Sequence, residues 1–110
     1  MIKISGIVIR GDGRAKKLDF PTANLDFDGN LESGVYAGKV EYVGKIYPAV
    51  IFLGRSRKFL EAHLLNFSGD LYGKKIAMEV GKKIREVMDF ENDDKLKEQI
   101  VKDIKCLQAL

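Results

Sequence analysis

The segment Phe20-Pro21-Thr22-Ala23-Asn24 contains the most distinctive pair of oxygen-bearing side chains in the sequence. Pro21 fixes its own φ and favours an extended conformation at Phe20, so Thr22 and Asn24 project from the same side of the chain. A hydroxyl and an amide oxygen this close together are hard donors of the kind that Mg²⁺ accepts beside phosphates. The alternative is a local turn in which both side chains bond nearby backbone groups, and these residues taken alone favour that alternative.

A carboxylate and an imidazole stand two residues apart at Glu61 and His63, in the same alternation as Leu65 and Phe67. If this side of the predicted strand faces inward, Glu61 lies at the mouth of a barrel, where a carboxylate is a candidate general base. The alternative for Glu61 is an exposed acid at a strand end. For His63, the favoured interpretation is a hydrogen-bonded packing residue.

Basic side chains accompany glycines in the loop Gly11-Asp12-Gly13-Arg14-Ala15-Lys16-Lys17. The loop is not a Walker A motif, because no Gly-Lys-Ser/Thr follows, and it is not a dinucleotide fingerprint, because the third glycine is missing and no helix pattern follows. It suits a flap that closes over phosphates, with a solvated basic loop as the alternative. Arg85, after the last predicted strand, suits contact with a phosphate or a flat ring, or an ordinary salt bridge.

Most of the sequence alternates as β-strands do. Strands are predicted over residues 2–9, 34–43, 46–53, 60–67 and 74–84, with a long loop over residues 10–20 and a type II′ hairpin turn at Gly44-Lys45. The last segment has helical spacing, with an N-cap at Asn92 and one apolar face formed by Leu96, Ile100, Ile104 and Leu107. The pattern predicts five or six antiparallel strands in a closed or nearly closed barrel, followed by one helix that covers a side or a mouth.

The composition is that of an ordinary globular protein: 110 residues, 45% hydrophobic, with a net charge of +3. It excludes wholesale disorder and two full domains, and no apolar run approaches the ~20 residues of a membrane span. The single Cys106 cannot form an internal disulfide, and the first residues do not read as a signal peptide, so we expect a cytoplasmic protein. One histidine and one cysteine favour oxygen ligands for any metal.

Taken together, these segments resemble the riboflavin kinases (flavokinases), which in many bacteria form the kinase module of bifunctional FAD synthetases. The resemblance runs from about Gly6 to Ala109, and it rests on the order and spacing of its segments, since no single motif is unique. The segments are Gly11 to Arg14, Phe20 to Asn24, Gly34-Val35-Tyr36-Ala37, Gly54, Glu61 to Phe67, Asp70-Leu71-Tyr72-Gly73, Ile84-Arg85-Glu86, Phe90 and Leu96 to Asp103.

The resemblance implies a mainly β fold: a six-stranded antiparallel, Greek-key-like β-barrel over about residues 1–85, with a C-terminal α-helix over about residues 92–108, in a single domain. It implies transfer of the γ-phosphoryl group of ATP to the 5′-hydroxyl of riboflavin, giving FMN and ADP. Thr22 and Asn24 would bind Mg²⁺ and nucleotide phosphates, Glu61 would be the catalytic base, and Arg85 would contact the flavin. The other nucleotide-binding residues would be Gly11, Gly13, Arg14 and Lys16.

Two departures from the family pattern stand near these residues. Asp19 occupies a position where the family usually has glycine, and the segment Arg55 to Phe59 is shorter than its counterpart. They motivate a second hypothesis, a non-catalytic flavin-binding or regulatory module. A third, a basic barrel that binds nucleic acid, ranks last because Tyr36, Tyr42 and Phe67 alternate with polar residues as core residues do. We therefore expect a monomeric kinase with no nucleic-acid or membrane partner and, lacking an adenylyltransferase module, no FAD synthesis.

Overall fold

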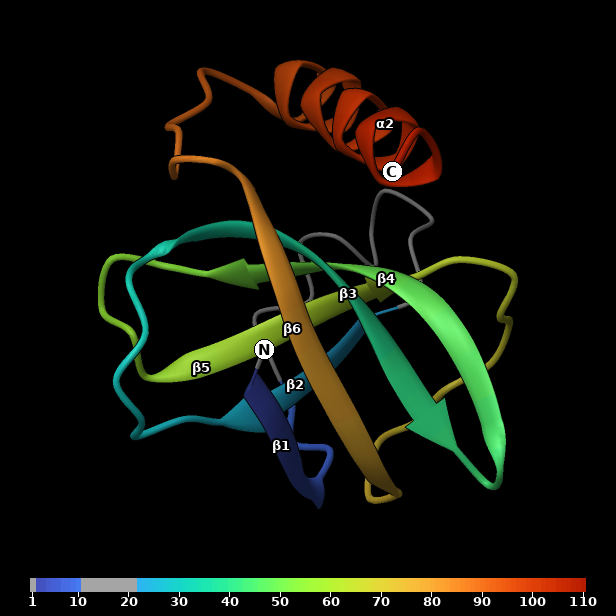
Figure 1. Cartoon of the computed structure of the whole chain (residues 1–110). Helices are drawn as coiled ribbons and strands as arrows, with labels where there is room; N and C mark the ends of the chain where they lie inside the picture. The colour runs from blue at the N-terminus through green and yellow to red at the C-terminus, as the bar shows by residue number, and fades with distance from the viewer. Residues whose placement is uncertain (1, 11–21) are drawn as a thin grey trace.

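The computed structural model describes residues 2–10 and 22–110. The described chain forms one antiparallel sheet and one helix (Figure 1). The elements are β1 (Ile2–Ile7), β2 (Thr22–Asp26), β3 (Gly34–Tyr42), β4 (Lys45–Leu53), β5 (Phe59–Leu64), β6 (Lys75–Arg85) and α2 (Asp93–Gln108).

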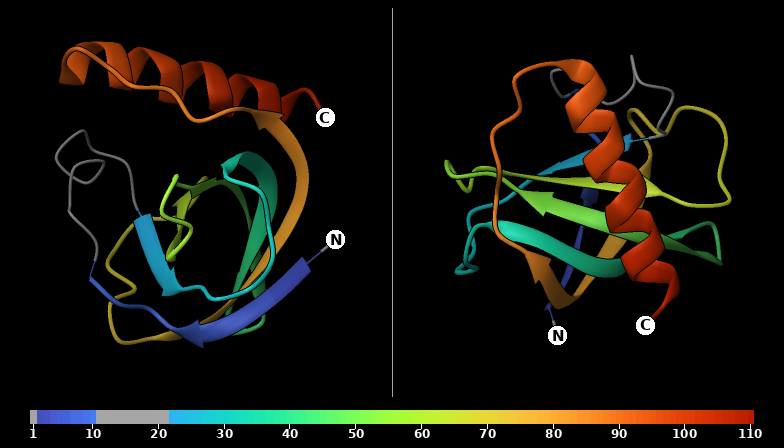
Figure 2. Two further views of the ribbon diagram at one scale, coloured as in Figure 1. Left: turned by 90° about the vertical axis from the view of Figure 1, so that its left-hand side faces the viewer. Right: turned by 90° about the horizontal axis from the view of Figure 1, so that it is seen from above.

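The sheet is six-stranded, with the order β1-β6-β3-β4-β5-β2. Its strands curl around a common interior as a half-barrel, and α2 lies outside the curl (Figure 2). The two edge strands approach each other where the Ile9 amide donates to the Asn24 carbonyl at 2.9 Å, just beyond the end of β1. The predicted mainly β fold of six antiparallel strands with a C-terminal helix is confirmed, as a half-barrel.

The interior of the curl is filled by the apolar side chains of alternating strand positions. Val40, Ile51, Leu53, Leu60 and Met78 are each 0% exposed. Each large aliphatic side chain buried in this way contributes roughly 1.5–3 kcal/mol relative to exposure. This burial is what holds the strands in register, because a slip of one residue would turn the whole apolar set outward.

β5 is shorter than the predicted strand over residues 60–67. Its Glu61 and His63 face outward, whereas an inward orientation was considered for them from the sequence. Leu60, Ala62 and Leu64 belong to the core cluster, so the two polar side chains project from the opposite face of the strand. The strand ends at Leu64 because the chain turns at Asn66, whose φ is +61°. Alternation alone does not separate the faces fully, because His63 is buried on one face while Leu60, Ala62 and Leu64 are buried on the other.

The β3–β4 hairpin turns one residue earlier than predicted. Tyr42 pairs with Lys45, so the loop is Val43-Gly44, with φ values of +49° and +75°. Positive φ at both positions is the pattern of a type I′ turn, whose twist matches that of the flanking strands. A β-branched residue at positive φ is unusual, and Val43 is 80% exposed.

The predicted helix is present and begins where its cap predicts. The Asn92 side chain accepts from the Lys95 amide at 2.9 Å, and Asp93 and Asp94 lie in the first turn. α2 packs against β4, with Ile100 buried at the contact. Among the described residues, no helix combines the length and apolar character needed to cross a membrane.

Candidate active site

The outer face of the half-barrel beneath α2 is crossed by a continuous row of paired residues. Asn24 of β2 pairs with Glu61 of β5, Glu61 pairs with Phe52 of β4, Phe52 pairs with Val35 of β3, and Val35 pairs with Arg85 of β6. Directly paired residues on antiparallel strands project from the same face. The ladder therefore gathers side chains that lie up to sixty-one positions apart in the sequence, from Asn24 to Arg85, on one surface.

A second row runs beside the first and contains the other polar residue of β5. His63 pairs with Thr22 on one side and with Val50 on the other. Val50 is 2% exposed, yet it is not part of the core cluster, so it is buried on this outer face. Thr22 and Asn24 thus share one face of β2, as the two-residue spacing predicts, and that face is also the face of Glu61 and His63.

Glu61 stands where two hollows meet. One, called the polar hollow because four of its lining side chains are polar, has a volume of about 460 Å³ and is lined by Arg10, Asn24, Phe52, Gly54, Ser56, Phe59 and Glu61. The other is a narrow slot of about 150 Å³ between the sheet and α2, and Phe52 and Glu61 also line it. A carboxylate at this junction touches both spaces, which is the position a proton acceptor needs between two bound reactants.

The slot between the sheet and α2 has mostly apolar walls. Its lining residues are Val35, Val50, Phe52, Glu61, His63, Arg85, Met88, Phe90, Leu96, Ile100 and Asp103. Apolar and aromatic walls with a few polar groups at fixed positions are typical of sites for small organic ligands.

Arg85 is held in the slot by a bidentate pair with Asp103 of α2. Its Nε and Nη2 atoms each donate to one carboxylate oxygen at 2.8 Å, and its Nη1 donates to the Glu86 carbonyl at 2.9 Å. Gln99 donates to the same carboxylate at 3.1 Å. Asp103 is 2% exposed, so this buried acid fastens α2 to the end of β6 and fixes the orientation of the guanidinium.

The family model described as riboflavin kinase (flavokinase) matches residues 1–110. The chain belongs to the riboflavin kinase family. It is 39% identical, over 116 residues, to a bifunctional riboflavin kinase/FMN adenylyltransferase of Buchnera aphidicola, covering 96% of this chain and 37% of that protein. It is 36% identical, over 115 residues, to an RNA-binding riboflavin kinase of Bacillus subtilis, covering 97% of this chain and 50% of that protein. The chain thus spans between about a third and a half of these relatives' length.

Solved structures share the fold. A crystal structure described as riboflavin kinase from Trypanosoma brucei superposes with a TM-score of 0.70 at 23% identity, covering 97% of this chain and 74% of that one. A Streptococcus pneumoniae chain described as a macrolide-efflux protein superposes with a TM-score of 0.78 at 26% identity, covering 96% of this chain and 36% of that one. Members of the riboflavin kinase family use ATP, generally with a divalent metal.

In this riboflavin kinase domain the structure brings together part of the predicted site. Thr22, Asn24, Glu61 and Arg85 share the outer face of the sheet. Gly11, Gly13, Arg14 and Lys16 lie outside the described residues.

The donor set of Thr22 and Asn24 suits a metal that is bound together with phosphates. Among the described residues there is no cluster of three or more histidine, cysteine or acidic side chains that would hold a cation alone. Mg²⁺ usually keeps few protein ligands and completes its shell with phosphate oxygens and water. Neutral oxygens on β2 beside a polar hollow fit that mode of binding.

Arg10 lines the site, although it was not among the predicted site residues. It lines the polar hollow, and its guanidinium carbon lies 4.2 Å from the centroid of the Tyr72 ring. Among the described residues that line this hollow it is the only cation, so it adds positive charge beside Asn24 and Glu61. Its position immediately before the basic glycine loop was the available signal.

Asp103 is a second site residue that the motifs did not reveal, although its position in the helix carries a signal. It stands seven residues after Leu96 and three after Ile100, on the apolar face of α2. An acid on a buried helix face requires a cationic partner. The helical spacing alone therefore predicts that Asp103 pairs with a lysine or an arginine, and Arg85 is that partner.

The shortened segment after Gly54 forms a tight turn and joins the site. The Arg57 amide donates to the Gly54 carbonyl at 3.0 Å, and Arg57 has a φ of +56°. Arg55 donates to Asp89 at 2.8 Å, which connects this turn to the segment between β6 and α2. The hydrogen bond from Arg55, with the guanidinium charge, holds the pKa of the Asp89 carboxyl below its ordinary value.

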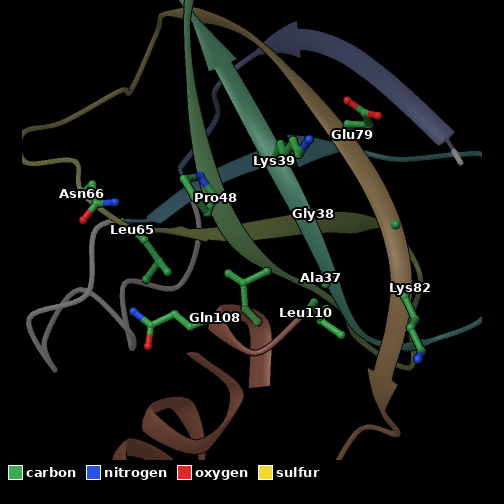
Figure 3. A pocket seen from close by; sticks show the side chains of 12 residues that line it. Ala37, Gly38, Lys39, Pro48, Leu65, Asn66, Glu79, Lys82, Gln108 and Leu110 are labelled. Atoms are coloured by element: carbon green, nitrogen blue, oxygen red, sulfur yellow. The ribbon is translucent and has the colours of Figure 1, made fainter. Parts of the chain in front are cut away.

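A third hollow, also of about 460 Å³, lies away from these residues, beside the C-terminal end of α2 (Figure 3). Its lining includes Lys39, Pro48, Leu65, Lys82 and Gln108, and none of the predicted site residues. Its lining also contains the carboxylate of Glu79 and the amide side chain of Asn66, which lie on different strands from Asn24 and Glu61 or beyond their ends. Thr22, Asn24, Glu61 and Arg85 all lie outside this hollow.

Proposed function

We propose that this chain is an ATP-dependent riboflavin kinase that converts riboflavin and ATP into FMN and ADP. The observation that carries the proposal is the row of paired residues from Asn24 through Glu61 to Arg85. It places the side-chain oxygen of Asn24, the carboxylate of Glu61 and the apolar slot side by side. Phosphoryl transfer depends on charge neutralisation and in-line positioning more than on covalent catalysis, and this arrangement suits both.

Thr22 and Asn24 would hold Mg²⁺ against the nucleotide phosphates in the polar hollow. The metal, when bound, supplies charge neutralisation on the transferred phosphoryl group. Arg10 adds a second positive charge on the same side. Gly11, Gly13, Arg14 and Lys16 are proposed to complete the nucleotide site.

Glu61 would act as the base. The 5′-hydroxyl oxygen of riboflavin forms a bond to the γ-phosphorus, the bond from that phosphorus to the bridging oxygen of ADP breaks, and the hydroxyl proton passes to the Glu61 carboxylate. The position of Glu61 at the junction of both hollows supports this role. The base must reach the 5′-hydroxyl of a riboflavin bound in the slot, and that hydroxyl must reach the phosphates in the polar hollow.

The flavin ring would occupy the apolar slot, with Arg85 at its edge. At about 150 Å³ the slot is smaller than the roughly 300 Å³ at the lower end of ligand sites. We therefore expect the segment that carries Met88 and Phe90 to shift outward when the ring enters. The pair with Asp103 keeps Arg85 in place during that shift.

The test is to mix the protein with riboflavin, ATP and Mg²⁺ and to separate FMN by chromatography. Glu61→Gln should lower kcat by roughly 10²- to 10⁴-fold, the usual range for a general base, while riboflavin binding is retained. Glu41→Gln, the same change at an exposed position of β3, is the matched control and should have no effect. If the wild-type protein makes no FMN, the proposal fails, and riboflavin binding without turnover would support the non-catalytic module.

The metal arrangement has its own test. Asn24→Ala should weaken Mg²⁺-ATP binding, measured by calorimetry, much more than riboflavin binding, measured by fluorescence quenching. Asn30→Ala, an exposed asparagine in the connection after β2, is the control. Equal losses for both ligands would refute the metal role.

The proposal also includes a monomer that acts in the cytoplasm, with no nucleic-acid or membrane partner. Size-exclusion chromatography with light scattering tests the monomer. Measuring oligonucleotide binding at several salt concentrations tests the proposed absence of a nucleic-acid partner. One relative is named an RNA-binding riboflavin kinase, which makes this test relevant. Tight, salt-sensitive binding would contradict it.

A further inference from the structure

The imidazole of His63 lies against the carboxylate of Glu61. Its Nε2 atom is 3.0 Å from Oε1 of Glu61, two positions earlier on the same strand. The side chain of His63 is 9% exposed, whereas that of Glu61 is 21% exposed. The histidine is therefore the inner member of the pair, and the carboxylate is the member that faces the openings.

The direction of this hydrogen bond follows from the chemistry of the two groups. An ionised carboxylate can only accept, so Nε2 must carry the hydrogen and donate it to Oε1. The other carboxylate oxygen, Oε2, is then left to accept a proton from a substrate. A donor on Oε1 thus orients the carboxylate and favours Oε2 as the oxygen that accepts the proton.

His63 is also the more deeply buried of the two. It lies one residue before the end of β5, is paired with Thr22 on β2 and Val50 on β4, and lines the slot beneath α2. Glutamate has three side-chain torsions, and its conformational freedom in a half-open position opposes any single orientation. A hydrogen bond from a buried ring restricts that freedom.

We propose that His63 is a positioning residue that orients the Glu61 carboxylate for proton transfer. The proposal rests on the proposed kinase function, in which Glu61 is the base. His63 lines the slot but not the polar hollow, whereas Glu61 lines both. It therefore acts from behind the carboxylate and does not contact the nucleotide.

The test compares His63→Leu, which removes the donor, with His63→Gln, whose amide nitrogen reaches about as far as Nε2. His63→Leu should lower kcat roughly 10- to 100-fold, the order of loss expected from a misplaced catalytic group, with the KM values for riboflavin and ATP within about twofold of wild type. His63→Gln should restore kcat to within about threefold of wild type. In a Glu61→Gln background, His63→Leu should cause little further loss, because the group it orients is already absent.

Melting curves determine whether each variant is folded, and His63→Met serves as a second donor-free variant if the leucine variant does not fold. An unchanged kcat in the folded donor-free variant overturns the proposal. A raised KM for riboflavin with normal kcat also overturns it, and assigns His63 to flavin contact. An equal loss of kcat in the wild-type and Glu61→Gln backgrounds overturns it in favour of a packing role. Absence of FMN from the wild-type protein overturns the kinase function itself, whereas normal turnover by the leucine variant overturns only the role of His63.

Discussion

Replacing Asp103 with asparagine should loosen both α2 and the slot in which the flavin is proposed to bind. The carboxylate is 2% exposed and accepts two hydrogen bonds from Arg85, each of 2.8 Å. Asparagine keeps the shape but loses the charge, and its amide group turns a donor toward a guanidinium donor. Removing one partner of a fully buried ion pair costs about 3–5 kcal/mol. Because the Arg85 side chain is 16% exposed, water recovers part of this loss, and we expect about 2–3 kcal/mol.

The assay is urea unfolding followed by circular dichroism at 25 °C. A loss of about 2–3 kcal/mol is a large share of the 5–15 kcal/mol that stabilise a typical domain, so the midpoint should shift clearly. Asp94→Asn is the matched control, because Asp94 is exposed in the first turn of α2 and contributes mainly through the helix dipole. That change should cost at most about 0.5–1 kcal/mol.

A double replacement separates stability from ligand recognition. Arg85→Met with Asp103→Leu substitutes an apolar pair for the ionic one, and such replacements of buried pairs are often neutral or stabilising. The double variant should regain most of the lost stability while binding riboflavin more weakly than wild type. The reasoning is refuted if Asp103→Asn is no more destabilising than Asp94→Asn. It is also refuted if the double variant remains as unstable as the single one.

Two further predictions concern exposed features. Val43→Asn should raise the free energy of unfolding by about 1 kcal/mol, because asparagine tolerates the positive φ of a type I′ turn and valine does not. Urea unfolding measures this free energy, and an unchanged midpoint would contradict the prediction. The hydrogen bond from Lys83, together with its charge, lowers the pKa of Glu32 from its ordinary value of 4.5, against a small opposing effect of burial. A carboxyl group whose pKa is lowered by folding stabilises the folded state at pH values above its ordinary pKa. This stabilisation is lost as the pH falls through the pKa of the folded state. Glu32→Gln should therefore lower Tm at pH 7, and the difference from wild type should disappear progressively below pH 4.5; a difference that persisted in acid would refute the assignment.

The elements could be predicted from the sequence better than the faces they present. Helical spacing and the Asn92 cap identified α2, since both signals are local and lie within a few residues of one another. The hairpin turn was predicted one residue too late, at Gly44-Lys45 instead of Val43-Gly44. The reason is that valine rarely adopts positive φ, so Val43 was not expected to be a turn residue. The sequence indicated a turn here, whereas the tertiary register of β3 on β4 determined its residues.

The face of β5 shows a limit of alternation as a signal. Glu61 and His63 were correctly paired on one side of the strand, but that side lies beneath α2 and outside the barrel interior. A strand that is covered on both faces carries apolar residues in both phases, so the polar residues do not identify the solvent side. Only the packing of α2 against β4, a long-range contact, resolves which face is which.

The site itself depends on register, which no local motif encodes. A two-residue spacing in β2 places Thr22 and Asn24 on one face, and the same spacing in β5 does so for Glu61 and His63. Whether these faces coincide depends on how the strands pair, and a slip of one residue would move Glu61 to the opposite side from Asn24. The apolar residues between them, Ala23 and Ala62, are each 0% exposed and form a cross-strand pair in the core. The register that buries these alanines is therefore the register that brings the Asn24 amide opposite the Glu61 carboxylate, so the stability of the half-barrel and the geometry of the proposed chemistry have the same physical origin.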